Sequence, residues 1–163
     1  MYAANVNGYR KVSFWKEKTL LEMTQGEWES LCDGCARCCL HKLQDLETDL
    51  VYYTSVACQY LDQDTCRCQN YKQRNELVPS CIILKPSHME EYSWLPDTCA
   101  YRLIHEGKEL FWWHHLVSGR DDTVHEANIS VNGKCISETH VHPDDFEEKT
   151  GTFVTEFVDH VNV

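Results

Sequence analysis

The sequence has little positive charge and no long apolar run. Its 163 residues include 15 Lys and Arg against 26 Asp and Glu, which gives a net charge of −11 at pH 7. Nucleic acids and anionic membrane surfaces are bound through basic patches, so this balance argues against both as partners. No stretch approaches the roughly 18 consecutive apolar residues of a membrane-spanning helix. We therefore expect no nucleic-acid or membrane partner, and leave open an unidentified protein partner.

The motifs of common enzyme classes are missing as well. The chain has no nucleophile elbow, no P-loop, no zinc-protease motif and no glycine-rich nucleotide-binding fingerprint. Its first residues, 1–11, lack the apolar core of a signal peptide. These absences favour a cytoplasmic protein and weigh against an enzyme.

The composition that is present predicts a folded domain. Hydrophobic residues make up 42% of the chain, which includes 5 Trp, 8 Tyr and 5 Phe. A chain of this length fits one domain and can bury about 70% of its unfolded surface, so its size alone does not require disulfide or metal cross-links for folding. We expect a loose N-terminus over residues 1–12 and a single cysteine-cluster domain over 13–163.

Three helices are predicted before residue 110. The first covers residues 14–23, and the capping box Thr24-Gln25-Gly26-Glu27 begins a second that leads directly into Cys32. Asp97 is predicted to cap the third, whose apolar stripe ends at Gly107. These helices are expected to surround the cysteine-rich middle of the chain.

Short extended segments complete the predicted fold. The β-branched and aromatic residues of 50–54 favour a strand, and Asn132-Gly133 favours a hairpin turn between 128–131 and 134–137. Residues 153–161 have the apolar spacing of an amphipathic helix. The expected class is therefore α+β: a small, irregular single domain with helices around a loop-rich cysteine/metal centre and a short sheet or hairpin.

Cysteine spacing is the strongest chemical signal. Ten cysteines are present, and the first four form the pattern C-x2-C-x2-C-C at Cys32, Cys35, Cys38 and Cys39. A C-x2-C turn brings two sulfurs near the separation required by a tetrahedral metal or a cluster edge. Two overlapping turns followed by more cysteines favour a metal site over a set of reduced, buried thiols.

The adjacent pair Cys38-Cys39 constrains how ligands are shared. Neighbouring side chains project about 100° apart on a helical turn and to opposite faces of a strand. The two are therefore expected to serve different centres, or one polynuclear cluster, unless only one of them is a ligand. All-sulfur sets suit Zn²⁺ or an iron–sulfur cluster, and the spacing does not choose between them.

The predicted ligands extend well beyond the first motif. Cys99 falls near a predicted helix N-terminus, which would lower its pKa, so it is either a ligand or a reactive thiol, with the ligand role favoured. Cys135 is interpreted as a buried small hydrophobe. The predicted metal ligands are Cys32, Cys35, Cys38, Cys39, Cys58, Cys66, Cys68, Cys81 and Cys99.

Other candidates carry weaker signals. His140 and His142 have a spacing that suits a metal in a strand, but an exposed loop before Pro143 is the favoured interpretation. His114 and His115 are expected to be structural or at an interface, His41 is a weak candidate ligand, and Asp33 is interpreted as a turn residue. Three cations lie near cysteines, where they either tune thiolate chemistry or are ordinary surface charges: Arg37, Lys42 and Arg67.

The chain resembles the YcgN-like branch of the CxxCxxCC cysteine-cluster proteins, which are described as zinc- or iron-chelating. The broad family pattern is matched by Cys32, Cys35, Cys38 and Cys39, then Cys58 with Leu61, Cys68 with Tyr71 and Arg74, and Cys81. Cys66 and Cys99 are similar to additional cysteines of the narrower branch, which also shares Phe14-Trp15 and Trp94-Leu95-Pro96. The resemblance covers roughly residues 13 to 130 and implies a metal or cluster site without supplying a reaction.

Three functions follow from these patterns. The favoured one is a metal-binding protein, holding Zn²⁺ or an iron–sulfur cluster through cysteines, with a structural, sensing or electron-transfer accessory role. One alternative is a redox or metal-dependent enzyme that uses a reactive thiol or an open metal position. The other is a zinc-stabilised interaction module with Trp112 and Trp113 in its binding patch.

Overall fold

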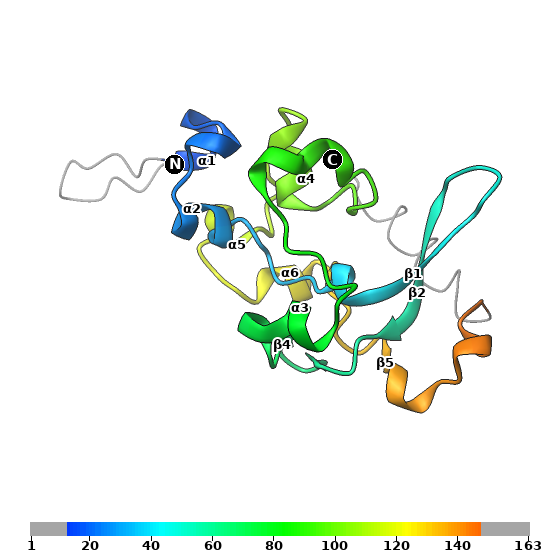
Figure 1. The fold of residues 1–163 in the computed structure, drawn as a ribbon. Helices are drawn as coiled ribbons and strands as arrows, with labels where there is room; N and C mark the ends of the chain where they lie inside the picture. The colour runs from blue at the N-terminus through cyan, green and yellow to red at the C-terminus, as the bar shows by residue number, and fades with distance from the viewer. Residues whose placement is uncertain (1–12, 148–163) are drawn as a thin grey trace.

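A computed structural model describes residues 13–147 and confirms the α+β class (Figure 1). Residues 1–12 and the helix predicted over 153–161 lie outside the described residues. The α-helices are α1 (Phe14–Glu17), α2 (Gln25–Ser30), α3 (Arg74–Leu77), α4 (Ala100–His105), α5 (His115–Ser118) and α6 (Thr123–Glu126). The strands are β1 (Leu40–Gln44), β2 (Val51–Ala57), β3 (Leu61–Asp62), β4 (Arg67–Cys68) and β5 (Ile136–Ser137). Short 3₁₀ turns join them: η1 (Leu20–Glu22), η2 (Arg37–Cys39), η3 (Tyr71–Gln73), η4 (Pro86–Glu91), η5 (Glu138–His140) and η6 (Pro143–Asp145).

The first predicted helix is broken into two short turns. Helix α1 ends at Glu17 and η1 begins after Thr19, so the single helix predicted over 14–23 is wrong. The physical reason is a capping box, because the Thr19 amide donates to Glu22 Oε2 at 2.8 Å and holds Thr19 in an extended conformation. The capping box predicted at the start of α2 is confirmed, with the Thr24 amide donating to Glu27 Oε2 at 2.8 Å.

Helix α4 begins later than predicted and ends where expected. Its N-cap residue is Cys99, so the prediction that Asp97 caps it is wrong; Asp97 instead pairs with Arg102 at 2.7 Å. At the other end Gly107 has a φ of +69°, and its amide donates to the Ile104 carbonyl at 3.1 Å. This is the left-handed C-terminal stop that favours glycine, and the predicted end of the helix is confirmed.

The main sheet has the order β1-β2-β5. Strand β2 confirms the strand predicted over 50–54 and extends it to Ala57. Strand β1 lies in the part of the chain expected to form a loop-rich centre; it pairs antiparallel with β2, with Leu40 opposite Ala57 and Lys42 opposite Tyr53. The change of register between these pairs is a bulge or irregularity placed directly after the first cysteine motif.

The predicted hairpin around Asn132-Gly133 is wrong, although the turn itself is present. Gly133 has a φ of +70°, and the Lys134 amide donates to the Val131 carbonyl at 2.9 Å. The chain that follows does not return along residues 128–131. It pairs in parallel with β2 as β5, with Val56 opposite Ile136. Strand β5 therefore pairs with β2, which is distant in sequence, and not with residues 128–131 as the turn signal predicts.

Three separate clusters of buried apolar residues form the interior. The first contains Trp28, Leu31 and Leu103 from helical segments, the second contains Leu40 beside the sheet, and the third contains Trp113 near α6. A second, two-stranded sheet pairs β3 with β4. Across the described part of the chain, no helix has the length and apolarity needed to cross a membrane.

Leu31 links the first cluster to the cysteine motif and has no exposed surface. Truncating it to Ala should lower the free energy of unfolding by about 2–5 kcal/mol, because the lost transfer energy adds to that of the cavity left behind. Denaturant unfolding of the full-length, metal-loaded protein measures this change. Leu21→Ala is the matched control: Leu21 is 73% exposed and should shift stability by less than about 0.5 kcal/mol. Equal effects of the two substitutions would contradict the assignment of this cluster as the core.

Candidate metal centre

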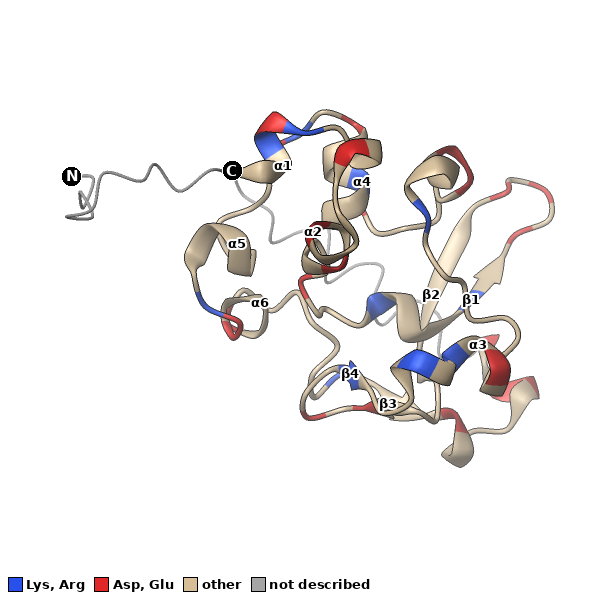
Figure 2. Ribbon diagram, turned by 60° about the vertical axis from the view of Figure 1, so that its left-hand side comes forward, with Lys and Arg blue, Asp and Glu red and all other residues tan. Residues whose placement is uncertain are grey.

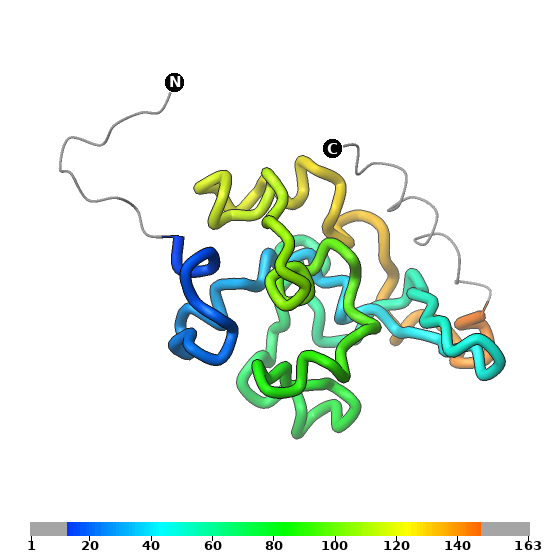
Figure 3. Tube along the Cα trace, turned by 90° about the horizontal axis from the view of Figure 1, so that it is seen from above, coloured from blue at the N-terminus to red at the C-terminus, as the bar shows by residue number. Residues whose placement is uncertain are grey.

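The segment from Cys32 to Cys39 runs through the middle of the molecule, between the helices and the sheet (Figures 1 and 3). It touches all three apolar clusters: Leu31 belongs to the first, Cys35 to the third, and Ala36 to the second. The motif is therefore fixed at several points by hydrophobic packing.

Asp33 organises the first C-x2-C turn. Its Oδ1 atom accepts a hydrogen bond from the Cys35 amide at 2.9 Å, which confirms the interpretation of Asp33 as a turn residue. The carboxylate is only 7% exposed, and within residues 13–147 its Oδ2 atom has no hydrogen-bond partner. A buried carboxylate oxygen without a partner is costly, so it marks a place where a cation or a hydrogen-bond donor is favoured.

Gly34 allows the turn to close against β4. It has a φ of +76°, and a Cβ atom placed there would lie 2.9 Å from the guanidinium carbon of Arg67. We expect Gly34→Ala to destabilise the protein by about 1–2 kcal/mol from the left-handed backbone alone. The thermal midpoint of unfolding, with metal content measured in parallel, tests this. Gly26→Ala is the control: no atom lies within 4 Å of a Cβ there, and Ala in α2 should leave stability unchanged or raise it. A harmless Gly34→Ala would show that the turn tolerates a side chain.

A first group of four thiols interacts electrostatically with Asp33. The charge of Asp33 is among the causes that raise the pKa of every member: Cys32, Cys35, Cys38 and Cys99. Burial is the main cause at Cys32, Cys35 and Cys99, whereas at Cys38 the hydrogen bond with Cys39 comes first. Cys32 and Cys38 retain exposed surface, which gives a metal ion access to the group.

The expectation of a lowered pKa at Cys99 is wrong. Burial raises the pKa of this thiol to about 12, outweighing the hydrogen bonds from the Tyr101 and Arg102 amides that lower it. Packing of Cys99 against the first apolar cluster supplies that burial. A thiol of this kind is a poor nucleophile at neutral pH, so the reactive-thiol alternative loses its chemical basis at this position.

A second group lies on the sheet side of the motif and contains Cys39, Cys58, Cys68 and Cys81. The Cys58 amide donates to the Cys39 carbonyl at 2.9 Å, which brings the end of β2 against the motif. Burial raises the pKa of Cys58 and of Cys81, and the neighbouring Cys68 contributes to both shifts. Cys81 also interacts with Cys38, so the two groups meet at the adjacent pair Cys38-Cys39.

Lys42 lies where the two groups meet. Its Nζ atom donates to the carbonyls of Cys38 and Leu40, both at 2.8 Å, and lies 5.2 Å and 5.0 Å from the ring centroids of Tyr53 and Trp94. Burial lowers the pKa of this ammonium, whereas the nearby thiols of both groups raise it. A cation held at this point favours the thiolate form of the ligands.

Arg37 is a buried residue and not an ordinary surface charge. It is 6% exposed, and its Nε atom donates to the Ile129 carbonyl at 2.9 Å. Its positive charge lowers the pKa of Cys35 against the larger effect of burial. Figure 2 shows further cations in blue at β4 and α3, whereas the acidic residues of the β1–β2 turn, in red, lie at the outer end of the sheet. The local charge around the thiols thus differs from that of the whole chain.

The motif C-x2-Y-x2-R, formed by Cys68, Tyr71 and Arg74, links the segments that carry the two groups. Arg74 stacks over the Tyr71 ring with its guanidinium carbon 3.9 Å from the centroid, and its Nη1 atom donates to the Tyr71 carbonyl at 2.6 Å. The Tyr71 hydroxyl donates to Glu29 in α2 at 2.5 Å. The motif therefore ties the segment after Cys68 to the helix before Cys32.

The histidines and tryptophans take mainly structural positions. His114 is buried, its Nε2 atom lies 2.9 Å from the Leu31 carbonyl, and its Nδ1 atom accepts from the Leu116 amide. The last contact requires the proton on Nε2, and burial lowers the pKa of the ring. His140 and His142 are exposed and lie outside any strand, whereas His41 pairs with Glu138 at 2.6 Å. Trp113 is buried and Trp112 is 60% exposed, so only one of the pair is available to a partner.

Cys66 lies inside the second apolar cluster and is 3% exposed. Two other cysteines, Cys39 and Cys135, pack against this cluster. Cys135, interpreted as a small hydrophobe, is partly buried there. The ligand role of Cys66 stays a prediction.

The donor set fits a thiophilic metal. Soft sulfur donors are the ligands that a cysteine-bound Zn²⁺ or iron–sulfur centre uses, and the unpartnered Asp33 oxygen beside them favours a positive charge there. Within residues 13–147, no three Cys, His, Asp or Glu side chains already surround a common point at metal-binding distance. Metal binding would therefore require neighbouring thiols to move closer together.

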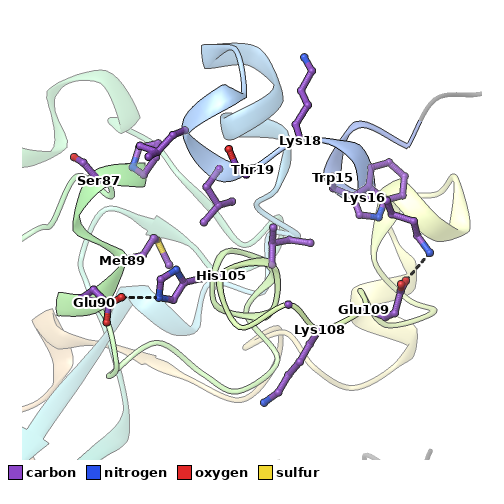
Figure 4. A pocket seen from close by; sticks show the side chains of 15 residues that line it. Trp15, Lys16, Lys18, Thr19, Ser87, Met89, Glu90, His105, Lys108 and Glu109 are labelled. Atoms are coloured by element: carbon purple, nitrogen blue, oxygen red, sulfur yellow. Dashed lines mark ion pairs between the residues drawn. The ribbon is translucent and has the colours of Figure 1, made fainter.

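A separate cavity of about 580 Å³ lies between the N-terminal turns and α4 (Figure 4). Its basic side chains lie against carboxylates: Lys16 with Glu109 at 2.5 Å, Lys18 with Glu27 at 2.7 Å, His105 with Glu90 at 3.6 Å and Lys108 with Glu106 at 2.6 Å. Its lining contains no cysteine. The cavity is therefore distinct from the thiol groups and offers a weaker chemical signal.

Comparisons with known proteins agree with the cysteine site. Residues 31–100 match a family model described as "Putative zinc- or iron-chelating domain", with the pattern CxxCxxCC. No solved structure matches the chain significantly. Two curated relatives carry the name UPF0260 protein: one from Brucella melitensis is 57% identical over 81% of this chain and 87% of its own length, and one from Agrobacterium fabrum is 56% identical over 83% of each. The chain belongs to the UPF0260 family, with a CxxCxxCC domain whose description supports metal binding.

Proposed function

We propose that the protein holds metal in two four-cysteine sets. The first set is Cys32, Cys35, Cys38 and Cys99, and the second is Cys39, Cys58, Cys68 and Cys81. The proposal is supported by the electrostatic interaction of each thiol of the first set with Asp33, whose Oδ1 atom accepts from the Cys35 amide, together with the interactions of Cys58 and Cys81 with Cys68. The division also places the adjacent residues Cys38 and Cys39 in different sets, which avoids the use of two neighbouring side chains by one mononuclear metal.

The same arrangement supports an accessory role in place of catalysis. Four thiolates complete the coordination of Zn²⁺ and leave no position for a substrate. In an iron–sulfur cluster, four cysteines likewise occupy the protein-facing positions and suit electron transfer or sensing. Lys42 and Arg37 hold positive charge beside these ligands, and Tyr71, stacked with Arg74 and hydrogen-bonded to Glu29, ties the segment after Cys68 to α2. We propose that this metal-binding protein acts in the cytoplasm.

Metal and sulfide quantification tests the proposal directly. Full-length protein is purified without oxygen, its zinc, iron and acid-labile sulfide are measured per chain, and an absorption spectrum is recorded. Two equivalents of zinc without sulfide support a pair of structural zinc sites, whereas iron with sulfide and visible absorption supports a cluster. A protein that folds cooperatively with neither stoichiometric zinc nor iron contradicts the proposed function.

A further inference from the structure

We propose that Cys66 and Cys135 form a dithiol pair outside the metal ligand sets, and that oxidation closes a disulfide between them. The disulfide would join the β3–β4 turn to the segment that leads into β5. This inference rests on the proposed function only in assigning the other cysteines to metal. It gives Cys66 a role different from the ligand role predicted from the sequence.

Gln63, in the β3–β4 turn, contacts both Cys66 and the segment that contains Cys135. Its backbone carbonyl lies 3.9 Å from the Cys66 sulfur, which donates to it. With its amide oriented to satisfy both neighbours, its side chain donates to the Cys135 carbonyl at 3.0 Å and accepts from the Ser137 amide at 3.2 Å. One residue therefore contacts both cysteines.

Asn132 also links the β3–β4 turn to the segment that leads into β5. Its Nδ2 atom donates to the carbonyls of Gln63 and Asp64 at 3.2 Å and 2.8 Å. Cys66 follows these contacts by two residues, and it lies in the apolar cluster against which Cys135 packs and which also includes Val131. The two segments are thus held together next to the pair before any covalent bond forms.

Two further hydrogen bonds reach the Cys66 sulfur, from the Ser130 hydroxyl and the Asn132 amide. Both donors belong to the segment that leads to Cys135. The Cys66 sulfur therefore lies beside that segment.

The oxidation can be written in two balanced steps. Cys135, the more accessible of the two, gives up its proton and attacks a hydroperoxide as the thiolate; its sulfur gains oxygen as a sulfenic acid, the O–O bond breaks, and the leaving oxygen takes the proton and departs as water or an alcohol. The Cys66 sulfur then attacks that sulfur, forming the S–S bond and releasing water. Two thiols lose two electrons and two protons in total, and one hydroperoxide is reduced.

The experiment uses diamide, which oxidises two thiols to a disulfide and is itself reduced to the hydrazine. Full-length, metal-loaded protein is treated without oxygen, alkylated, digested and examined by mass spectrometry, with metal content measured before and after. We expect a peptide pair linked through Cys66 and Cys135, a mass loss of two hydrogens in the intact chain, and unchanged metal content. Cys66→Ser and Cys135→Ser should each abolish the linked peptide and retain the full metal content.

Two results would overturn the inference. One is a wild-type protein in which both thiols stay alkylatable after diamide treatment while its metal remains bound. The other is a Cys66→Ser variant that loses metal whereas Cys135→Ser keeps it, which would return Cys66 to the ligand set. A protein that binds no metal in any form contradicts the proposed function, while a linked peptide in that protein would still support the pair.

Discussion

Cys35→Ser should remove one of two metal centres and leave the other in place. Cys81→Ser should remove the second and spare the first, and the double variant should bind no metal. The reason is that Cys35 belongs to the group around Asp33, whereas Cys81 interacts with Cys68 on the sheet side. The measurement is metal content per chain by elemental analysis on protein purified without oxygen.

The pattern of loss distinguishes two centres from one cluster. If all sulfurs serve a single polynuclear centre, either substitution should lower the whole metal content and not half of it. Cys135→Ser provides the matched control, because it removes a partly buried cysteine outside both sets and should leave the metal content unchanged. Full retention of metal in both Cys35→Ser and Cys81→Ser would show that neither thiol is a ligand.

Complete metal removal should abolish cooperative unfolding of the domain. Structural Zn²⁺ contributes about 10–16 kcal/mol per site in small metal-dependent folds, whereas a typical domain is stable by only about 5–15 kcal/mol. The described structure adds a specific reason, since three apolar clusters are joined through one cysteine segment. Calorimetry before and after chelation, with residual metal measured, should show the loss of the unfolding transition.

Restoration of the metal provides the control for this experiment. Adding back the metal that the purified protein contained should restore the transition, and an equal concentration of Mg²⁺ should not, because thiolate ligands do not suit that ion. A metal-free protein with an unchanged melting temperature would mean that the metal has no structural role.

Local sequence signals predicted the elements that are held by local contacts. The Thr24–Glu27 capping box, the Gly107 helix end and the strand near residue 50 depend on residues close in sequence, and all three are confirmed. Strand β1 and the parallel strand β5 could not be predicted in this way. Each exists because β2 pairs with it, and neither has an apolar pattern that identifies this partner.

The chemical environment of the candidate metal site depends more on tertiary packing than the helices and strands do, so less of it could be predicted. The cysteine pattern identified the ligand type, but the pKa of Cys99 follows from its burial and not from its place at the start of α4. Similarly, no feature of the sequence near Arg37 indicates that its side chain reaches Ile129 and becomes buried. The carboxylate of Asp33 could be predicted as a turn residue but not as the common neighbour of four thiols.

The cysteine segment touches separate apolar clusters, and two of these clusters contain a tryptophan whose fluorescence can report on its surroundings. Trp28 contacts Tyr101 at 4.4 Å between ring centroids in the first cluster, close to Cys32, whereas Trp113 packs with Cys35 in the third. A metal that tightened the first thiol group would change the surroundings of both indoles, and one that occupied only the second would leave them largely as they are. The fluorescence of single-tryptophan variants could therefore follow the order in which the two sets fill during assembly, without any added label.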